Sequence, residues 1–311
     1  MTRPLTVALD AMGGDHAPRS VVLGALEAMS QVTDCKFLFF GDKDKIEPLL
    51  RKHLDLQRIS EIRHTTAKVG NDDKPTQVLR TGHETSMWQA IESVAKGEAD
   101  CIVSGGNTGA LMVLARKHLK MLPGIDRPAI AAPLPTLKGQ TVVLDLGANV
   151  DCTPENLEQF ALMGAVYAKA VLGVRDPTIG LINVGEEEQK GSDLVKKAAA
   201  LLRASSLPGR FVGFIEGDKI GCGIVDVAVT DGFTGNVLLK TAEGTAHFIA
   251  ANLKSLINQS WLSKLSMIFA IPVLKRLRSR IDPRNYNGAM FVGLGGVCVK
   301  SHGGMDENGF A

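Results

Sequence analysis

The most constraining feature of this chain is a repeated order of short apolar run, turn rich in Gly, Asp and Asn, and helical stretch. The apolar runs with their turns occupy residues 5–10, 36–42, 99–109, 141–149, 178–191 and 225–235. These runs are too apolar to alternate, which is typical of parallel strands buried on both faces. The pattern predicts an α/β fold, a three-layer α/β/α sandwich around a mostly parallel sheet.

Helix-start signals follow several of these turns. Pro18 suits the first turn of a helix over 18–30, because the N–H that proline lacks is unpaired there anyway. Thr153 as N-cap and Pro154 as first helical residue predict a helix over 155–172. A chain of 311 residues fits a single α/β/α domain over 1–311, with two lobes as the alternative.

The turns after the expected strands point to a binding site. In an open parallel sheet, ligands bind beyond the carboxyl ends of the strands. The turns there read MGGD, GGNTG, LGANVD, NVGEEEQKG and TDGFTGN. Their glycines admit close backbone approach, and a following helix N-terminus favours an anion. We therefore expect a polar, anion-accepting cleft. Neither G-x-G-x-x-G nor the P-loop pattern follows a strand, which disfavours dinucleotide and nucleoside-triphosphate sites.

Charge and cysteine usage narrow the function classes. The 35 Lys and Arg against 33 Asp and Glu leave a net charge of +2, which argues against a dedicated nucleic-acid binder. No C-x-x-C pair occurs among Cys35, Cys101, Cys152, Cys222 and Cys298, as is usual in a reducing compartment. The most apolar stretch, 265–274, is too short to span a bilayer. We expect a cytoplasmic protein without a signal peptide.

One segment departs from the pattern. Residues 244–281 contain no Asp or Glu but carry Lys254, Lys264, Lys275, Arg276, Arg278 and Arg280. Apolar residues recur every four positions at Ile249, Leu253, Ile257, Trp261, Leu265 and Phe269. This predicts a protruding basic amphipathic helical hairpin over 245–285. Its apolar face suits packing on the sheet or on a second subunit, or contact with a membrane interface. Its basic residues suit the membrane surface or an acidic protein partner. The candidate contact residues are Lys254, Trp261, Lys264, Phe269, Arg276 and Arg278.

The turns together resemble the phosphate acyltransferase (PlsX) family of bacterial phospholipid synthesis. The resemblance runs over 5–304, through ALDAMGGDHAP, DDKPT, GNTGALM, DLGANVDCTPENLEQFALMG, NVGEEEQKG, DGFTGNVLLKTAEG and KSHG. The stretch QVLRTGHETSM departs from the family's usual Lys/Arg run, with only Arg80 and His83 basic. The chain stops at Ala311, whereas family members usually continue with a C-terminal helix.

The resemblance implies a reaction in which acyl-[acyl carrier protein] and inorganic phosphate give acyl phosphate and free carrier protein. It implies a fold similar to phosphotransacetylases and isocitrate/isopropylmalate dehydrogenases, a homodimer, and peripheral association with the inner face of the cell membrane. It implies no cofactor, an acidic acyl carrier protein as donor, and a membrane-bound glycerol-3-phosphate acyltransferase as downstream acceptor.

The implied chemistry suggests roles for the residues of the turns. Attack of a phosphate oxygen on a thioester needs cations and N–H groups for the oxyanion, and one acid or base. We expect Lys190, Asp231 and His302 to be catalytic, with Asp231 as the orienting or general-base carboxylate. Asn107, Asn183 and Lys190 are expected to bind phosphate or the oxyanion. The substrate-binding set is Asp10, Gly13, Gly14, Asn107, Thr108, Gly109, Asn149, Asn183, Asn236 and Lys240.

Other functions stay open at this point. One is a small-acyl phosphotransacetylase that uses acetyl-coenzyme A; another is a decarboxylating dehydrogenase on the same fold. A third is a non-catalytic membrane-surface scaffold that binds acyl carrier protein. The consecutive Glu186, Glu187 and Glu188 are not expected to bind a metal, because adjacent carboxylates rarely converge on one ion. Covalent catalysis by a cysteine is disfavoured, because Cys35, Cys101 and Cys298 lie in or beside apolar runs.

Overall fold

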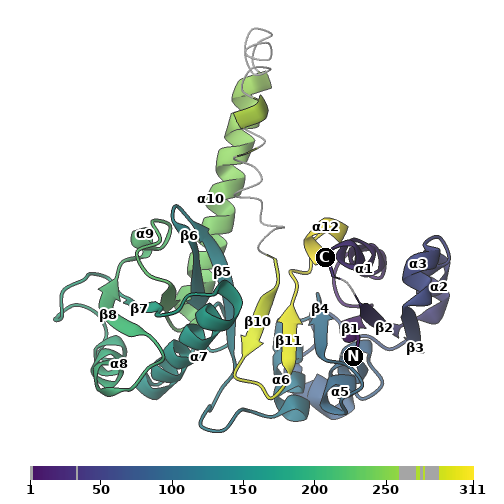
Figure 1. The fold of residues 1–311 in the computed structure, drawn as a ribbon, viewed down its shortest axis with the longest axis horizontal. Coiled ribbons are helices and arrows are strands. Elements are labelled where there is room, and N and C mark those ends of the chain that lie inside the picture. The colour runs from purple at the N-terminus through teal and green to yellow at the C-terminus, as the bar shows by residue number, and fades with distance from the viewer. Residues whose placement is uncertain (1–2, 33, 259–270, 274–275, 277–286) are drawn as a thin grey trace. The chain divides into compact units, whose positions relative to one another are not determined.

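A computed structural model describes residues 3–32, 34–258, 271–273, 276 and 287–311. The chain divides into two compact units. Unit 1 comprises Met1–Ala132 together with Asn287–Ala311, and unit 2 comprises Pro133–Tyr286. Unit 1 is thus built from two separate stretches of sequence, one from each end of the chain (Figure 1).

The sheet of unit 1 has the strand order β3-β2-β1-β4-β11-β10-β5. Its neighbouring strands are parallel except β10, which is antiparallel to both β11 and β5. The strand bounds are β1 (Leu5–Asp10), β2 (Cys35–Gly41), β3 (Ser60–His64), β4 (Cys101–Ser104), β5 (Ala129–Thr136), β10 (Ala289–Val292) and β11 (Val297–Lys300).

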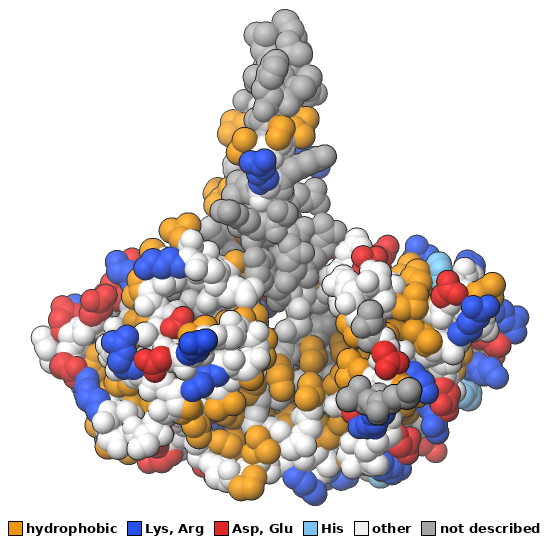
Figure 2. Space-filling view, in the orientation of Figure 1, with side chains coloured by type: hydrophobic (Ala, Val, Ile, Leu, Met, Phe, Trp, Pro, Cys, Tyr) orange, Lys and Arg blue, Asp and Glu red, His pale blue; other side chains and the backbone are white. Residues whose placement is uncertain are grey.

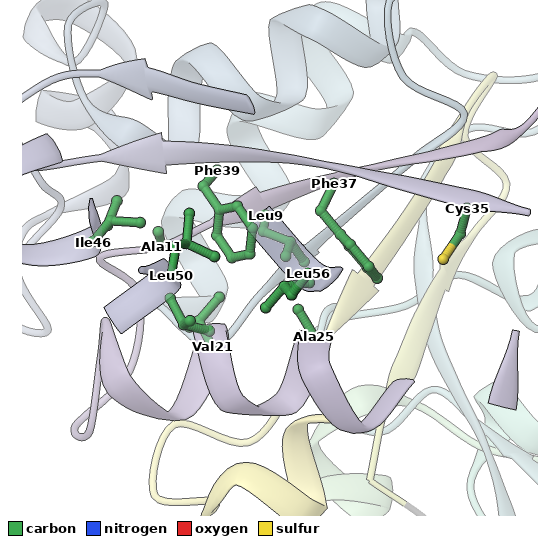
Figure 3. Packing of buried hydrophobic residues seen from close by; sticks show 11 residues of the cluster. Leu9, Ala11, Val21, Ala25, Cys35, Phe37, Phe39, Ile46, Leu50 and Leu56 are labelled. Atoms are coloured by element: carbon green, nitrogen blue, oxygen red, sulfur yellow. The ribbon is translucent and has the colours of Figure 1, made fainter. Parts of the chain in front are cut away.

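Helices cover both faces of this sheet. They are α1 (Arg19–Gln31), α2 (Lys43–Leu50), α3 (Leu54–Arg58), α4 (Pro75–Thr81), α5 (Ser86–Ala95), α6 (Thr108–Leu119) and α12 (Glu307–Phe310). Leu9, Phe37 and Phe39 pack with buried side chains of α1, α2 and α3 in one core cluster (Figure 3). Successive residues of a strand face opposite ways, so Ala8 and Leu38 lie on the other face of the sheet, and they are buried too. Helix α5 contacts β1, β2 and β4. Burial on both sides explains the continuous apolar runs.

The sheet of unit 2 is parallel, with the order β6-β9-β7-β8. Its strands are β6 (Gly139–Leu144), β7 (Thr178–Ile182), β8 (Arg210–Ile215) and β9 (Val227–Val229), and its helices are α7 (Pro154–Leu172), α8 (Asp193–Ala204), α9 (Gly217–Ile220) and α10 (Gly232–Asn258). Helix α7 packs closely on this sheet at Gly164, where an added Cβ would lie 2.9 Å from Leu144 Cδ2.

The predicted fold class is confirmed, since the structure is a mixed α/β sheet with flanking helices. Some boundaries and elements were predicted wrongly or missed. Helix α1 begins at Arg19, with Pro18 in the N-cap position, one residue later than expected. The repeated pattern also missed β3, β5, β8, β10 and β11.

Helix α10 extends well beyond the sheet of unit 2 (Figure 1). From residue 241 to residue 258 its side chains are exposed, except the half-buried Ile257. Exposed apolar groups on this part include Phe248, Ile249 and Leu256 (Figure 2). Most of the hairpin expected over 245–285 lies outside the described residues. Within the described part of the chain, no helix combines the length and apolar character needed to cross a membrane.

Candidate active site

In unit 1, three turns meet at one edge of the sheet. Strands β1, β4 and β11 are neighbours and run parallel, so their carboxyl ends lie together. The backbone N–H of Asp15 donates to the carbonyl oxygen of Gly303 at 2.8 Å, which joins the first turn to the third. The structure therefore brings together the expected residues Asp10, Gly13, Gly14, Asn107, Thr108, Gly109 and His302.

Asn107 uses its whole side chain to hold protein backbone. Its Oδ1 accepts from Ala110 N at 3.1 Å and caps α6. Its Nδ2 donates to the carbonyl oxygens of Asn71 at 2.9 Å and Asp73 at 3.1 Å. The side chain thus clamps the loop before α4 to the α6 N-terminus. Gly109 serves the same junction, because an added Cβ would lie 2.8 Å from Pro75 Cγ.

Asp10 lies at the end of β1 and is only 1% exposed. Burial raises its pKa, while hydrogen bonds from the hydroxyls of Ser86 and Ser104 act in the opposite direction. His302 is exposed; its backbone N–H donates to Asn287 Oδ1 at 2.9 Å, and its Nδ1 accepts from Gly304 N at 3.2 Å. The turns of unit 1 therefore carry an exposed imidazole and a buried carboxyl group at the same edge of the sheet.

In unit 2, the turns after β6, β9 and β7 form the corresponding edge, since these strands are adjacent and parallel. The backbone N–H of Gly232 donates to the carbonyl oxygen of Asn149 at 2.7 Å. Gly147 packs beside Asn236, because a Cβ added to Gly147 would lie 3.4 Å from the Cβ of Asn236. The remaining expected residues of this unit lie on the same turns or at the start of α10: Asn183, Lys190, Asp231 and Lys240.

Lys190 and Asn183 lie on the turn between β7 and α8. Lys190 Nζ donates to Glu187 Oε1 at 2.8 Å, and this bond raises the pKa of the amine and lowers that of the carboxyl. The amine is half-exposed and charged. Asn183 Nδ2 donates to the carbonyl oxygens of Gly185 at 3.0 Å and Lys190 at 3.1 Å, so it closes the turn on itself. Glu188 pairs with Arg203.

Asp231 caps helix α10. Its Oδ1 accepts from Thr234 N at 2.8 Å and its Oδ2 from Thr234 Oγ1 at 3.0 Å, so the carboxylate has a fixed orientation. Nine residues after Asp231 on α10, the exposed Lys240 donates to Glu243 at 2.8 Å. Asp231 and Lys190 thus belong to turns of neighbouring strands, a carboxylate and a cation at one edge of the sheet.

The candidate contact residues of the basic segment are only partly described. Lys254 is exposed on α10, and Arg276 is also exposed. Trp261, Lys264, Phe269 and Arg278 lie outside the described residues.

Sequence reasoning missed a buried carboxylate in unit 2. Asp145, 0% exposed, accepts from Gly147 N at 3.2 Å, Ala148 N at 3.0 Å, and Asn149 N and Nδ2 at 2.7 and 2.8 Å. It also missed Ser104 and Lys300 in unit 1. One signal was available: VALD and VVLD end two of the apolar runs alike, each placing an aspartate at a strand end.

The cysteines give a testable contrast. Burial raises the pKa of Cys101 to about 11 and also raises that of Cys298, whereas Cys222 is exposed. Because the thiolate is the reactive form, we expect iodoacetamide to modify Cys222 first in the folded protein, and Cys101 and Cys298 only after unfolding. Peptide mass spectrometry measures the order. Cys222→Ser should retain full activity; a large loss would support a cysteine in the chemistry.

Comparison with known proteins gives a consistent result. The family model described as "Fatty acid synthesis protein" matches residues 5–311. The phosphate acyltransferase of Rhodospirillum centenum is 55% identical over 100% of this chain and 88% of its own length. The phosphate acyltransferase of Paramagnetospirillum magneticum is 54% identical over 100% of this chain and 89% of its own length.

Solved structures show the same fold at low identity. The EutD phosphotransacetylase of Staphylococcus aureus is similar over 99% of this chain and 91% of its own, with a TM-score of 0.63 and 16% identity. A branched-chain phosphotransacylase from Enterococcus faecalis V583 is similar over 98% of this chain and 95% of its own, with a TM-score of 0.63 and 16% identity. At such identity these likenesses establish the fold alone.

The relatives place this chain among the acyltransferase enzymes. Within that class, the chain belongs to the fatty acid synthesis protein family, whose curated relatives here are phosphate acyltransferases.

Proposed function

We propose that this enzyme transfers the acyl group of acyl-[acyl carrier protein] to inorganic phosphate, and that the acyl phosphate serves phospholipid synthesis. The observation that carries the proposal is 55% identity to a phosphate acyltransferase along the whole chain. The turns of unit 2 agree with it, because they combine the charged Lys190 with the oriented carboxylate of Asp231.

The reaction assigns a step to each of these groups. A phosphate oxygen attacks the thioester carbonyl carbon, a C–O bond forms, and the C–S bond then breaks to release the carrier thiolate, which takes up a proton. Lys190 offsets the negative charge of phosphate and the oxyanion. Asp231, held by Thr234, orients phosphate or accepts its remaining proton.

The proposal extends to partners. The donor is an acidic acyl carrier protein, and the basic segment that includes the exposed Lys254 offers it a complementary charge. We also propose a homodimer, peripheral association with the inner face of the cell membrane, and delivery of acyl phosphate to a membrane-bound glycerol-3-phosphate acyltransferase. The exposed apolar side chains of α10 support the membrane association.

The direct test incubates the purified protein with a long-chain acyl-acyl carrier protein, with and without phosphate, and traps acyl phosphate as the hydroxamate. We expect phosphate-dependent hydroxamate. No product from a folded protein would contradict the proposal. The phosphotransacetylase-like fold favours one second candidate, so acetyl-coenzyme A is the matched alternative donor. Product from neither donor would favour a scaffold.

Lys190→Ala is expected to lower turnover about 100-fold, because removing one group that stabilises an oxyanion costs that much. Lys196→Ala is the matched control, since Lys196 also pairs with an acidic residue three positions earlier, Asp193 at 3.6 Å, and is similarly exposed. The control should stay within about twofold of wild type. Equal rates for both variants would remove Lys190 from the mechanism.

A further inference from the structure

The buried carboxylate of Asp10 organises the site edge of unit 1. Asp10 Oδ1 accepts from Ser86 Oγ at 2.6 Å, and Oδ2 accepts from Ser104 Oγ at 2.7 Å. Ser86 is 1% exposed and Ser104 is 0% exposed. A carboxyl group enclosed in this way has both oxygens occupied by protein. Direct contact with the substrate is therefore a poor role for Asp10.

The two serines differ in what else they hold. Ser104 Oγ also accepts from the backbone N–H of Gly106 at 3.1 Å. Gly106 directly precedes Asn107, Thr108 and Gly109, so the hydroxyl links the carboxylate to the turn expected to meet the substrate. Ser86 is the first residue of α5, and within the described residues its hydroxyl donates to Asp10.

Two further contacts fix this turn in place. A Cβ added to Gly13 would lie 2.8 Å from Gly106 N and against Asp10 Oδ2, so the turns after β1 and β4 touch at the carboxylate. From β11, Lys300 Nζ donates to the carbonyl oxygen of Gly105 at 3.2 Å. The backbone before α6 is therefore held on several sides, and Ser104 supplies its link to the buried carboxyl group of Asp10.

We propose that Ser104 is a positioning residue for the acyl transfer: with its hydroxyl held by Asp10, it sets the Gly106 N–H and the Asn107–Thr108–Gly109 turn where phosphate binds. The inference rests on the proposed function for its substrate. Asp10 then acts through Ser104 rather than on phosphate itself. A small displacement of such a turn is costly, because misplacement by about 1 Å can reduce a rate 100-fold.

The test compares Ser104→Ala with Ser86→Ala. Both changes remove one buried hydroxyl from the same carboxylate, so both should lower Tm to a similar extent. Ser104→Ala should lower kcat/KM for phosphate at least about tenfold, with KM for the acyl donor unchanged. Ser86→Ala should stay within about twofold of wild type in kcat/KM for phosphate.

A second readout separates this inference from the proposed function. Calorimetric titration with inorganic phosphate should show at least about tenfold weaker binding to Ser104→Ala than to Ser86→Ala. If Ser104→Ala fails to fold, Ser104→Cys keeps the side-chain size but donates only weakly, and it should show the same selective loss. Equal phosphate binding and equal kcat/KM in the two serine variants would overturn the positioning role. An inactive wild type that binds phosphate would overturn only the proposed reaction.

Discussion

Gly235→Ala is expected to destabilise unit 2 by at least about 3 kcal/mol and to abolish measurable acyl transfer. The added Cβ would lie inside van der Waals contact of the Asp145 carbonyl oxygen, and 2.9 Å from its carbonyl carbon. That backbone cannot yield easily, because Asp145 N donates to Thr230 O at 3.0 Å and Thr230 N donates to Leu144 O at 2.8 Å. Relief of the clash would therefore separate the start of α10 from β6.

Gly244→Ala provides the control for this change within the same helix. A Cβ there would meet nothing within 4 Å, so the substitution should stabilise α10 by about 0.5–1 kcal/mol. Chemical denaturation of both variants measures the opposite signs. Wild-type stability in Gly235→Ala would show that the close approach of α10 to the turn after β6 does not exist in solution.

Asp145→Ala is the second change with a large expected effect, a loss of about 3 kcal/mol or more. The fully buried carboxylate accepts from three backbone N–H groups and from Asn149 Nδ2. Alanine would remove the acceptor oxygens of these four hydrogen bonds. Activity should fall further than stability explains, because the turn that carries Asn149 would lose its shape. Thermal denaturation and the hydroxamate assay at a temperature where the variant is folded separate the two effects.

Two variants control for the aspartate change. Asp218 is 68% exposed, and within the described part of the chain its carboxylate pairs with its neighbour Lys219, so Asp218→Ala should change stability by no more than about 0.5 kcal/mol. Asp145→Asn keeps one oxygen acceptor but turns an NH₂ group toward donors, so it should fall between wild type and Asp145→Ala. An Asp145→Ala protein as stable as Asp218→Ala would contradict the role of this carboxylate.

Local signals predicted those elements that depend on local contacts. Helix α7 has the expected N-cap, Thr153, and starts at Pro154, one residue before the expected range; Asn156 reinforces the cap in a capping box that lies entirely within four residues. The strands missed by the pattern depend on distant partners. Strand β11 is only Val297–Lys300, and it becomes a parallel strand by pairing with β4 almost 200 residues earlier. Four residues cannot specify such a partner.

The site shows the same division. The turns that carry Lys190 and Asp231 follow directly from the βα repeats. The residue type of Asn107 predicts a contact with phosphate or the oxyanion. In the structure its amide donates to carbonyl oxygens of residues 71 and 73, a contact that no spacing in the sequence reveals. The roles of Ser104 and Asp145 depend likewise on which buried donors surround a carboxylate.

The discontinuity of unit 1 has a consequence for biosynthesis. Strand β4 leaves the ribosome long before β11, which is its neighbour in the finished sheet. At roughly 5–20 residues per second, that edge of β4 stays unpaired for on the order of ten seconds or more. Unit 2 is synthesised completely within that interval. We therefore expect unit 2 to mature first on the nascent chain, while the open edge of β4 is the part most in need of chaperone protection against pairing with other chains.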